Sequence, residues 1–401
     1  MSDPSKSSTP AGGDDVPRAA FLYDPRVRGI VYQLVTLALV VWVGTEFWTN
    51  AVSNLERASI ASGFGFLDTT AGFGIIQTLV SYTEESSYGR AFLVGLLNTL
   101  LVAAIGIVLA TLIGFLVGIG SLSRNWLIRQ ICFIYVETMR NIPLLLHIFF
   151  WYFAVLRSVP GPRQSIEIAG SVFINNRGIY LPRPLAEDGF GFVLIVLALG
   201  VVVSFGIARW ARRRREMTGQ QFPVLYWTLG LVAGFPLLVF LILGLPVSFE
   251  YPGLRGLNFA GGVTLIPELI SLVLALGIYT AGFIAENVRA GIQAVNKGQS
   301  EAASALGLTP GQTMRLIIIP QALRVIIPPL TNQYLNLTKN SSLAVAIAYP
   351  DLVSVFAGTV LNQTGQAVEI LFLTMSVYLT LSIATSLLMN WYNARIALVE
   401  R

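Results

Sequence analysis

Long apolar segments, separated by shorter polar ones, run through most of this chain. Eight of them are about as long as the roughly 20 residues that a helix needs to cross the hydrocarbon core of a bilayer. They are residues 30–48, 91–120, 131–156, 190–208, 224–244, 263–286, 317–338 and 367–391. The pattern predicts an all-α, polytopic membrane protein with about eight transmembrane helices.

Three features interrupt this pattern or refine it. Pro143 breaks the third span, and the seven apolar residues Leu343–Tyr349 are too short to cross a bilayer before Pro350. We expect the short run to be a re-entrant or interfacial helix, because irregular backbone at membrane depth must lie against protein or water. The second span carries small sites for close helix packing, at Gly95, Gly106, Gly114 and Gly118.

Composition and charge agree with a membrane protein and fix its expected orientation. The chain is 54% hydrophobic and 12% charged, about half the charged fraction of a soluble protein. With both termini in the cytoplasm, 18 of the 26 Lys and Arg residues fall inside and 8 outside. The net charge of +5 therefore reflects membrane topology and does not indicate nucleic-acid binding. The single cysteine, Cys132, excludes an internal disulfide and argues against a metal site.

A polar, small-residue stretch, Gly298–Pro320, lies between the sixth and seventh spans on the expected cytoplasmic side. We expect a short helix over 299–306, ended by Gly307 in a left-handed conformation. Thr309 then begins a second helix with a Thr-x-x-Gln capping box to Gln312 and Pro310 at the first helical position. In the first helix we place Glu301 in the opening turn, where the helix dipole favours a carboxylate. The alanines after Glu301 leave a surface that another protein could approach closely.

This stretch resembles the cytoplasmic loop of importer-type ABC transporter permeases. The family pattern of Glu-Ala-Ala, three residues, Gly, nine residues, Ile, one residue and Leu-Pro is met, except that Ile319 replaces Leu. The resemblance implies that the loop docks into a cleft of a separate ATPase subunit. The residues implied in coupling are Glu301, Ala302, Ala303, Gly307 and Pro320.

The resemblance extends over residues 91–156 and 263–391, the five-span core of the polar amino acid uptake permeases. It rests on the runs GLLNTLLVA (95–103), ETMRNIPLLL (137–146), YTAGFIAENVRAGI (279–292) and KNSSLA (339–344). The additional first helix and inserted helix pair resemble the longer permease of the general L-amino acid transporters of Gram-negative inner membranes. We divide the chain into a disordered cytoplasmic tail (1–29), a first helix with a periplasmic loop (30–90), a first core part (91–156), an insertion (157–262), a second core part (263–392) and a cytoplasmic tail (393–401).

The same resemblance implies partners and a cofactor arrangement. It implies a second homologous permease, two copies of an ATPase, a periplasmic amino acid binding protein and an L-amino acid substrate. ATP and magnesium would be held by the ATPase, and this chain would hold no cofactor or metal. The sequence agrees, because it contains no Gly-x4-Gly-Lys-Ser/Thr phosphate loop.

The seventh span is the most polar and is the expected substrate path. Asn332, Asn336 and Lys339 fall on one helical face, and polar groups in hydrocarbon are costly unless they face a cavity or another subunit. Lys339 and nearby hydroxyls could bind the carboxylate of an amino acid, and asparagine carbonyls its ammonium. The other candidates are Asn340, Ser341, Ser342 and the lone histidine, His147. Alternatively, the polar face of the seventh span lies at the outer membrane surface and contacts only water, and His147 only hydrogen-bonds a neighbouring helix.

Two Glu-x-x-Arg pairs, Glu137 with Arg140 and Glu286 with Arg289, lie at the inner ends of two spans. At this spacing each glutamate can reach its arginine. The pairs could lock the cytoplasmic end of a pathway or merely neutralise charge at the interface. No acidic residue lies at the centre of a span, so an ion relay has no obvious carrier.

The sequence therefore predicts the transmembrane subunit of an ATP-driven importer, not an enzyme. Two alternatives remain: an ion-coupled secondary carrier, and a structural permease subunit whose partner holds the substrate site. No catalytic nucleophile, base or metal cluster favours a membrane enzyme.

Overall fold

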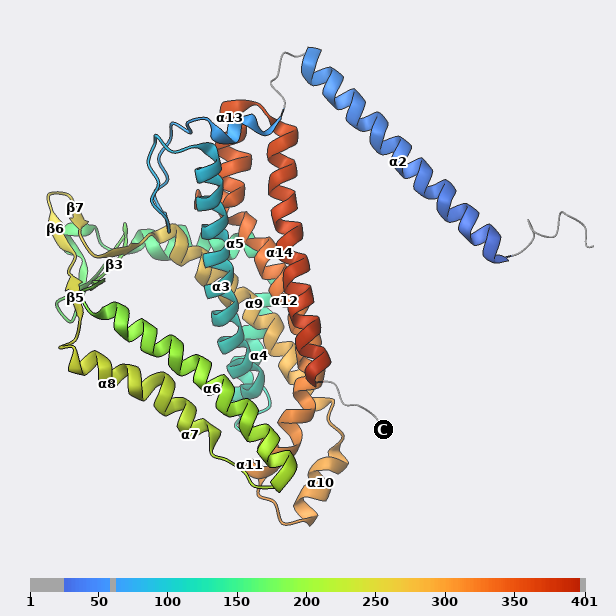
Figure 1. The fold of residues 1–401 in the computed structure, drawn as a ribbon, viewed down its shortest axis with the longest axis vertical. Helices are drawn as coiled ribbons and strands as arrows, with labels where there is room; N and C mark the ends of the chain where they lie inside the picture. Colours follow the sequence, from blue (N-terminus) through green and yellow to red (C-terminus); the bar gives the residue numbers. More distant parts are fainter. Residues whose placement is uncertain (1–24, 58–62, 397–401) are drawn as a thin grey trace, which may run out of the picture.

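The structure is a computed structural model that describes residues 25–57 and 63–396. The predicted tails therefore lie largely outside the described residues. Helix α2 (Pro25–Arg57) begins within the tail predicted for residues 1–29, so that boundary is wrong by five residues. The span within it, Val27–Asn50, makes no buried contact with the rest of the chain and stands apart in Figure 1.

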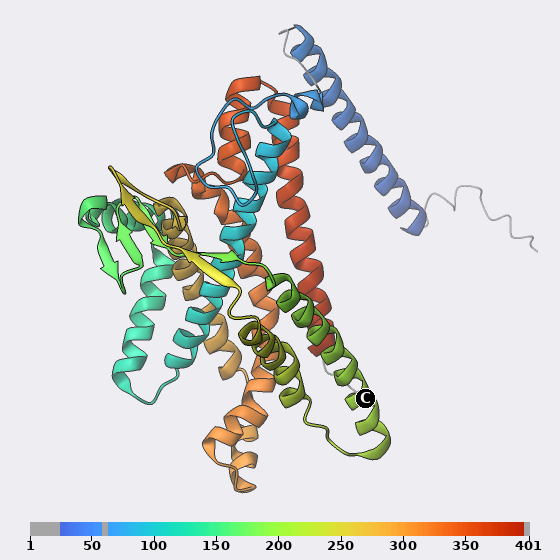
Figure 2. The same cartoon turned by 60° about the vertical axis from the view of Figure 1, so that its left-hand side comes forward.

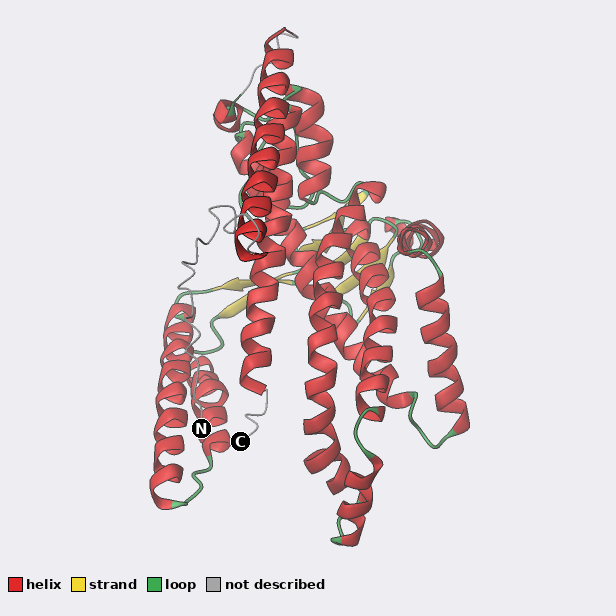
Figure 3. Ribbon diagram, turned by 90° about the vertical axis from the view of Figure 1, so that its right-hand side faces the viewer, coloured by secondary structure: helices red, strands yellow, loops and turns green. Residues whose placement is uncertain are grey.

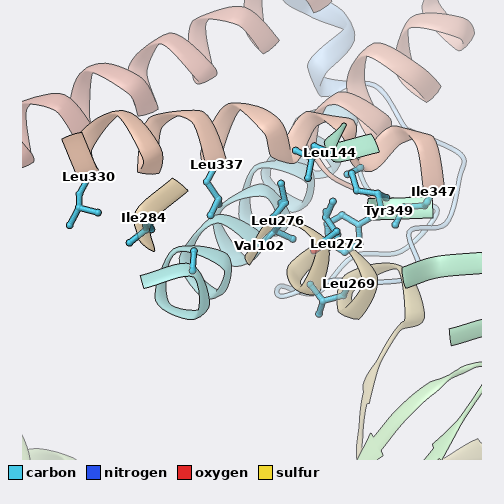
Figure 4. Packing of buried hydrophobic residues seen from close by; sticks show 14 of the residues in the cluster. Val102, Leu144, Leu269, Leu272, Leu276, Ile284, Leu330, Leu337, Ile347 and Tyr349 are labelled. Atoms are coloured by element: carbon cyan, nitrogen blue, oxygen red, sulfur yellow. The ribbon is translucent and has the colours of Figure 1, made fainter. Parts of the chain in front are cut away.

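Four long helices form the centre of the molecule (Figure 1). They are α3 (Tyr88–Gly120), α9 (Pro267–Gln293), α12 (Ile319–Asn340) and α14 (Ala367–Ile396). Apolar side chains of α3, α9 and α12 interlock in a core that includes Val102, Leu272 and Leu337, as Figure 4 shows. Helices α3 and α9 approach so closely that a Cβ atom built on Gly118 would lie 2.8 Å from the Ala285 carbonyl oxygen. The prediction of small packing sites on this helix is confirmed.

The third predicted span is sharply bent at Pro143. Its first half is α4 (Trp126–Asn141), and its second half is α5 (Leu144–Phe149) with the π-helical η2 (Phe150–Val155) and η3 (Leu156–Ser158). The chain bends by 107° between the two halves, and the break falls at Pro143 because proline cannot continue the hydrogen bonding of a straight helix. Seven helices of the described chain are long and apolar enough to cross a membrane, or eight if this pair is one span.

Small strands occupy the loops on one side of the molecule (Figure 1), and Figure 3 shows them in yellow. We call residues 166–186 and 247–265 the β module. An antiparallel sheet joins β1 (Ile166–Ile168), β2 (Val172–Asn175), β3 (Gly178–Leu181) and β8 (Val263–Leu265). Two further sheets of two strands each pair β4 (Arg183–Ala186) with β5 (Val247–Glu250) and β6 (Gly253–Arg255) with β7 (Asn258–Ala260). A turn of 3-10 helix, η4 (Pro162–Gln164), precedes β1. The sixth span was predicted to begin at Val263, which is wrong because β8 pairs with β3 there and the helix begins at Pro267.

The insertion forms a separate helical hairpin, seen at the front of Figure 2. One arm is α6 (Phe190–Thr218), and the other comprises α7 (Val224–Leu229), the π-helical η5 (Gly230–Gly234) and α8 (Phe235–Ile242). Both arms start or end at the β module, through β4 and β5. The two predicted spans of the insertion are confirmed as apolar helices of spanning length.

The remaining elements connect the core helices at its two ends. At one end lie α10 (Lys297–Ala305), α11 (Pro310–Thr313) and the π-helical η6 (Met314–Ile318). At the other end lie η1 (Phe64–Asp68), η7 (Ser341–Ile347), η8 (Val353–Val360) and α13 (Leu361–Thr364). The apolar run Leu343–Tyr349 lies mostly within η7, a short helix as predicted.

Candidate functional site

The polar loop forms a helix–turn–helix that projects at one end of the molecule (Figure 1). Gly307 adopts φ +76°, the left-handed conformation predicted for the end of α10. The Thr309 hydroxyl accepts the Gln312 N–H, the Gln312 side chain accepts the Thr309 N–H, and Pro310 occupies the first helical turn. The predicted stop, capping box and proline position are all confirmed.

The predicted place of Glu301 within α10 is wrong. The Asn296 side chain accepts the Gly298 N–H at 2.8 Å and starts the helix at Lys297, two residues earlier than predicted. Glu301 therefore lies in the second turn, where the helix dipole is weaker. Glu301 and Ala302 are exposed, whereas Ala303 is buried. The exposed side of α10 thus presents one carboxylate among small side chains.

A nearly continuous helical rod joins this loop to α12. The helical segment 310–347 contains one wide turn, η6, immediately before Pro320. Proline has no N–H to donate, and a π turn of this kind accommodates the missing hydrogen bond. Gln321 donates from Nε2 to Gln299 Oε1 at 3.4 Å, which links α12 to α10. The loop helix α10 and the base of α12 are thus in direct contact.

Three of the predicted path residues form an exposed polar face on α12. Asn332, Asn336 and Lys339 are all exposed, and none of their side chains makes a hydrogen bond to another described residue. The opposite face of α12 is buried through Ile326, Leu330 and Leu337. A polar face of this kind on a spanning helix requires a water-filled cavity or another subunit, because hydrocarbon would penalise it.

The other predicted path residues do not share that exposed face. Ser341 is buried and donates to the Thr338 carbonyl, while Ser342 donates to the Lys339 carbonyl and Asn340 is half-buried. His147 is buried on α5, with its ring 5.6 Å from that of Tyr279 on α9. Its Nε2 atom has no hydrogen-bond partner among the described residues. The histidine is thus a core residue set apart from the exposed asparagines and lysine.

The two Glu-x-x-Arg pairs lie beside one cavity of about 320 Å³ between α4 and α9. Arg289 binds both carboxylate oxygens of Glu286, at 2.6 and 3.0 Å, as the spacing predicted. The second predicted pair is wrong: Arg140 lies 5.6 Å above the Phe283 ring, and Glu137 accepts a hydrogen bond from Asn141. The Arg140 guanidinium of α4 is attracted to the face of the Phe283 ring on α9, and this contact replaces the predicted ion pair within α4. Because the one ion pair formed lies within α9, it cannot itself lock two helices together.

Comparisons with known proteins identify the kind of molecule that carries this arrangement. The General L-amino acid transport system permease protein AapQ of Rhizobium johnstonii is 53% identical over 403 residues, covering all of both chains. The chain belongs to the binding-protein-dependent transport system inner membrane component family. The pattern of this family matches residues 217–398 of the permease.

Two further relatives also match nearly the whole permease. The putative amino-acid ABC transporter permease protein YhdX of Escherichia coli is 53% identical, covering 94% of this chain and 96% of its own. The glutamate/glutamine/aspartate/asparagine transport system permease protein BztB of Rhodobacter capsulatus is 42% identical, covering 96% and 99%. The resemblance drawn from the loop motif is confirmed by relatives that include the first helix and the insertion.

Sequence reasoning missed a buried polar junction between α3 and the break after η7. Asn98 donates at 2.9 Å to the carbonyls of both Gln77 and Pro350, and Thr99 accepts the Leu352 N–H at 3.0 Å. Gly95 leaves room for this contact, since its Cβ would lie 3.0 Å from the Leu352 Cα. The signal was present in the GLLNTLLVA run, where one asparagine interrupts an apolar helix. A buried amide of this kind needs hydrogen-bond partners, which the break supplies.

Asp351, at the centre of this junction, is fully buried in the permease. Its Oδ1 accepts the Ser354 N–H at 2.9 Å, and the Tyr378 hydroxyl donates to Oδ2 at 3.3 Å. Loss of solvent raises the pKa of this carboxyl from 3.8 to about 7, against the opposing effect of the Ser354 hydrogen bond. Between pH 3.8 and about pH 7, the folded permease therefore keeps a proton on Asp351 that the unfolded chain has released.

This raised pKa gives a testable dependence of stability on pH. Because the unfolded chain loses the proton near pH 3.8 and the folded chain near pH 7, stability falls as the pH rises through that window. We expect Asp351 to cost the purified permease about 2 kcal/mol between roughly pH 5.5 and 8, and Asp351→Asn to remove this part of the slope. The measurement is the thermal unfolding midpoint at both pH values. Asp68→Asn, at an exposed aspartate, is the control, and an unchanged slope in Asp351→Asn would contradict the assignment.

The arginines of the predicted outer loop take several distinct positions. Arg157 lies 5.5 Å above the rings of both Tyr152 and Phe153. Arg177 and Arg183 line a cavity of about 900 Å³ between the β module, α3 and the loop before it, and Arg177 donates to the Leu257 carbonyl. No described residue lining that cavity is acidic. The arginines thus give the β-module side of the permease a cationic recess.

Proposed function

We propose that this permease is the transmembrane subunit of an ATP-driven importer that carries L-amino acids from periplasm to cytoplasm by alternating access. The observation that carries the proposal is the continuous helical segment that joins the exposed docking loop to the exposed polar face of α12. The loop end of this segment can be moved by a partner subunit. The other end carries the polar face and can change the surroundings of a polar solute. The names of the relatives, which describe amino acid transport, support the substrate class.

In this proposal α10 docks on a separate ATPase, present as two copies that hold ATP and magnesium. The exposed small residues Ala302 and Ala305 allow a partner's backbone to come close, and Glu301 offers a single carboxylate for a basic group of the partner. Ala303 is buried, so that α10 moves together with the segment behind it. The loop end is cytoplasmic by the excess of Lys and Arg there, which supports insertion in the bacterial inner membrane.

A second, homologous permease covers the polar face of α12 and completes the path. Lys339 supplies a cation for the amino acid carboxylate, and the amide oxygens of Asn332 and Asn336 accept hydrogen bonds from its ammonium. The β module lies at the end of the inserted hairpin away from its α6–α7 turn, and there a periplasmic binding protein delivers the substrate. Glu286 and Arg289 neutralise each other at the inner end of the path.

The energy source is tested with the complete transporter reconstituted in liposomes. Uptake of radiolabelled amino acids is expected only when ATP is on the side that carries the ATPase, and it should resist a protonophore. Uptake without nucleotide would favour the alternative of an ion-coupled secondary carrier. ATP-driven uptake that survives every substitution on this chain's polar face would favour a structural subunit whose partner holds the substrate.

The polar face itself is tested by Lys339→Ala combined with Asn336→Ala. Each lost hydrogen bond to a charged group weakens binding, so we expect roughly a 10- to 100-fold loss of amino acid uptake. The measurement is the initial uptake rate at saturating ATP. The control is Thr380→Ala, which removes an exposed hydroxyl from the spanning helix α14. Uptake at the unmodified rate in the double variant would remove these residues from the path.

A further inference from the structure

The turn of the inserted hairpin contains a cavity that the proposed transport cycle does not use. It has a volume of about 380 Å³ and lies where α6 ends and α7 begins. Its lining residues are Ala208, Ala211, Arg212, Arg215, Gln221, Phe222 and Val224. Apart from the two arginines and Gln221 the wall is small or apolar, and none of the described residues that line the cavity is acidic.

The turn around this cavity is held in place by specific contacts. Gly219 ends α6 with φ +71°, and its N–H bonds the Arg215 carbonyl at 3.0 Å. Phe222 packs between two tryptophans, with ring centres 5.3 Å from Trp210 and 6.1 Å from Trp227. These contacts hold the turn that forms the cavity in a defined conformation.

The arginines of this helix end are not equivalent. Arg214 is engaged, because it lies 5.3 Å above the Trp210 ring and donates to Gln220 at 3.0 Å. Arg212 and Arg215 are three residues apart, so they share the helix face that lines the cavity. The only ion pair among the described residues is the one in α9, so neither arginine is neutralised by a described carboxylate. Two unpaired guanidinium groups beside one cavity are suited to bind an anion such as a phosphate.

The surroundings of the cavity indicate where that anion comes from. The hairpin exposes large apolar side chains along both arms, such as Phe205 and Leu229, as expected of a surface that faces lipid. Trp210 and Trp227 are each about half exposed at its turn, 49% and 54%, a placement typical of the membrane–water interface. A ligand here must satisfy two cations at one end and an apolar wall at the other. A phospholipid with a net negative headgroup has both properties.

We propose that the cavity at the α6–α7 turn binds the headgroup of an anionic phospholipid, with Arg212 and Arg215 holding its phosphate. The acyl chains then run along the small residues Ala208 and Ala211, beside Val224. Basic pockets between membrane helices bind anionic headgroups in this way. The site would anchor the hairpin to the leaflet on the side of α10.

The test measures lipid binding to the full-length permease, purified in an uncharged detergent, by native mass spectrometry. The probes are dioleoyl phosphatidylglycerol, which is anionic, and dioleoyl phosphatidylcholine, which has no net charge. We expect the permease to retain the anionic lipid preferentially. Arg212→Gln with Arg215→Gln should weaken that binding by roughly 30-fold, since each basic residue near a headgroup contributes about a factor of five.

The matched control is Arg209→Gln with Arg213→Gln, which removes the same charge from the same helix at positions that do not line the cavity. This variant should keep the preference for the anionic lipid, and gel filtration should show both variants to be folded. Equal loss in the two variants would reduce the site to general surface charge and overturn the proposal. Binding of both lipids alike, or displacement of the lipid by millimolar inorganic phosphate, would overturn it as well.

Discussion

Replacing Gly118 by valine is expected to separate α3 from α9 and to abolish accumulation of folded permease. A Cβ atom at this position would lie 2.7 Å from the Val288 Cβ and 2.8 Å from the Ala285 carbonyl oxygen. The oxygen belongs to the backbone of a buried helix and cannot turn aside as a side chain could. Overpacking of a core typically costs about 1–3 kcal/mol, and a β-branched residue against backbone belongs at the upper end. The measurement is the yield of monodisperse permease after extraction.

The control for this prediction is Gly206→Val, in the middle of α6. Nothing lies within 4 Å of a Cβ atom built on Gly206, so valine there brings the same change in helix propensity without a clash. We expect this variant to accumulate normally. If Gly118→Val gave the same yield as Gly206→Val, the close approach of α3 and α9 would be wrong.

The features predicted correctly from the sequence depend on residues a few positions apart. Apolar length gave the spans, and the order of Gly307, Thr309, Pro310 and Gln312 gave the turn after α10, because capping rules act over three or four residues. The polar face of α12 followed in the same way from helical periodicity. Such patterns do not depend on what the rest of the chain does.

The features missed depend on segments that lie far apart in the sequence. Asn98 and Pro350 are 252 positions apart, so no local pattern pairs them. Strand β8 is likewise defined by its pairing with β3, more than 80 residues earlier, which hid the true start of α9. Arg140 had a glutamate at a favourable spacing on its own helix, yet its guanidinium lies over the Phe283 ring of α9 instead. Pro143 marked the break in the third span, but proline does not specify the 107° angle, which the packing of α5 against α9 sets.

Replacing Gly307 by valine is expected to abolish ATP-coupled uptake while leaving membrane insertion and assembly of the core intact. Gly307 has φ +76°, and nothing lies within 4 Å of a Cβ atom placed there. The effect is therefore backbone strain alone, about 1–3 kcal/mol for a residue held in the left-handed region and highest for β-branched side chains. The loop can relieve this strain by opening the turn, because Leu306 and Thr309 on either side of Gly307 are exposed. Opening the turn moves α10 away from the direction set by the capped start of α11.

The matched control is Gly311→Val, in the same loop and also without a neighbour within 4 Å, but with no left-handed conformation to strain. Both variants should reach the membrane in equal amounts, and only Gly307→Val should lose uptake at saturating ATP. Under the proposed function a separate ATPase subunit would still bind nucleotide, so basal hydrolysis should persist without transport, which separates lost coupling from lost assembly. Normal uptake by Gly307→Val would mean that α10 tolerates reorientation, and the motion of the ATPase would then have to enter this permease elsewhere.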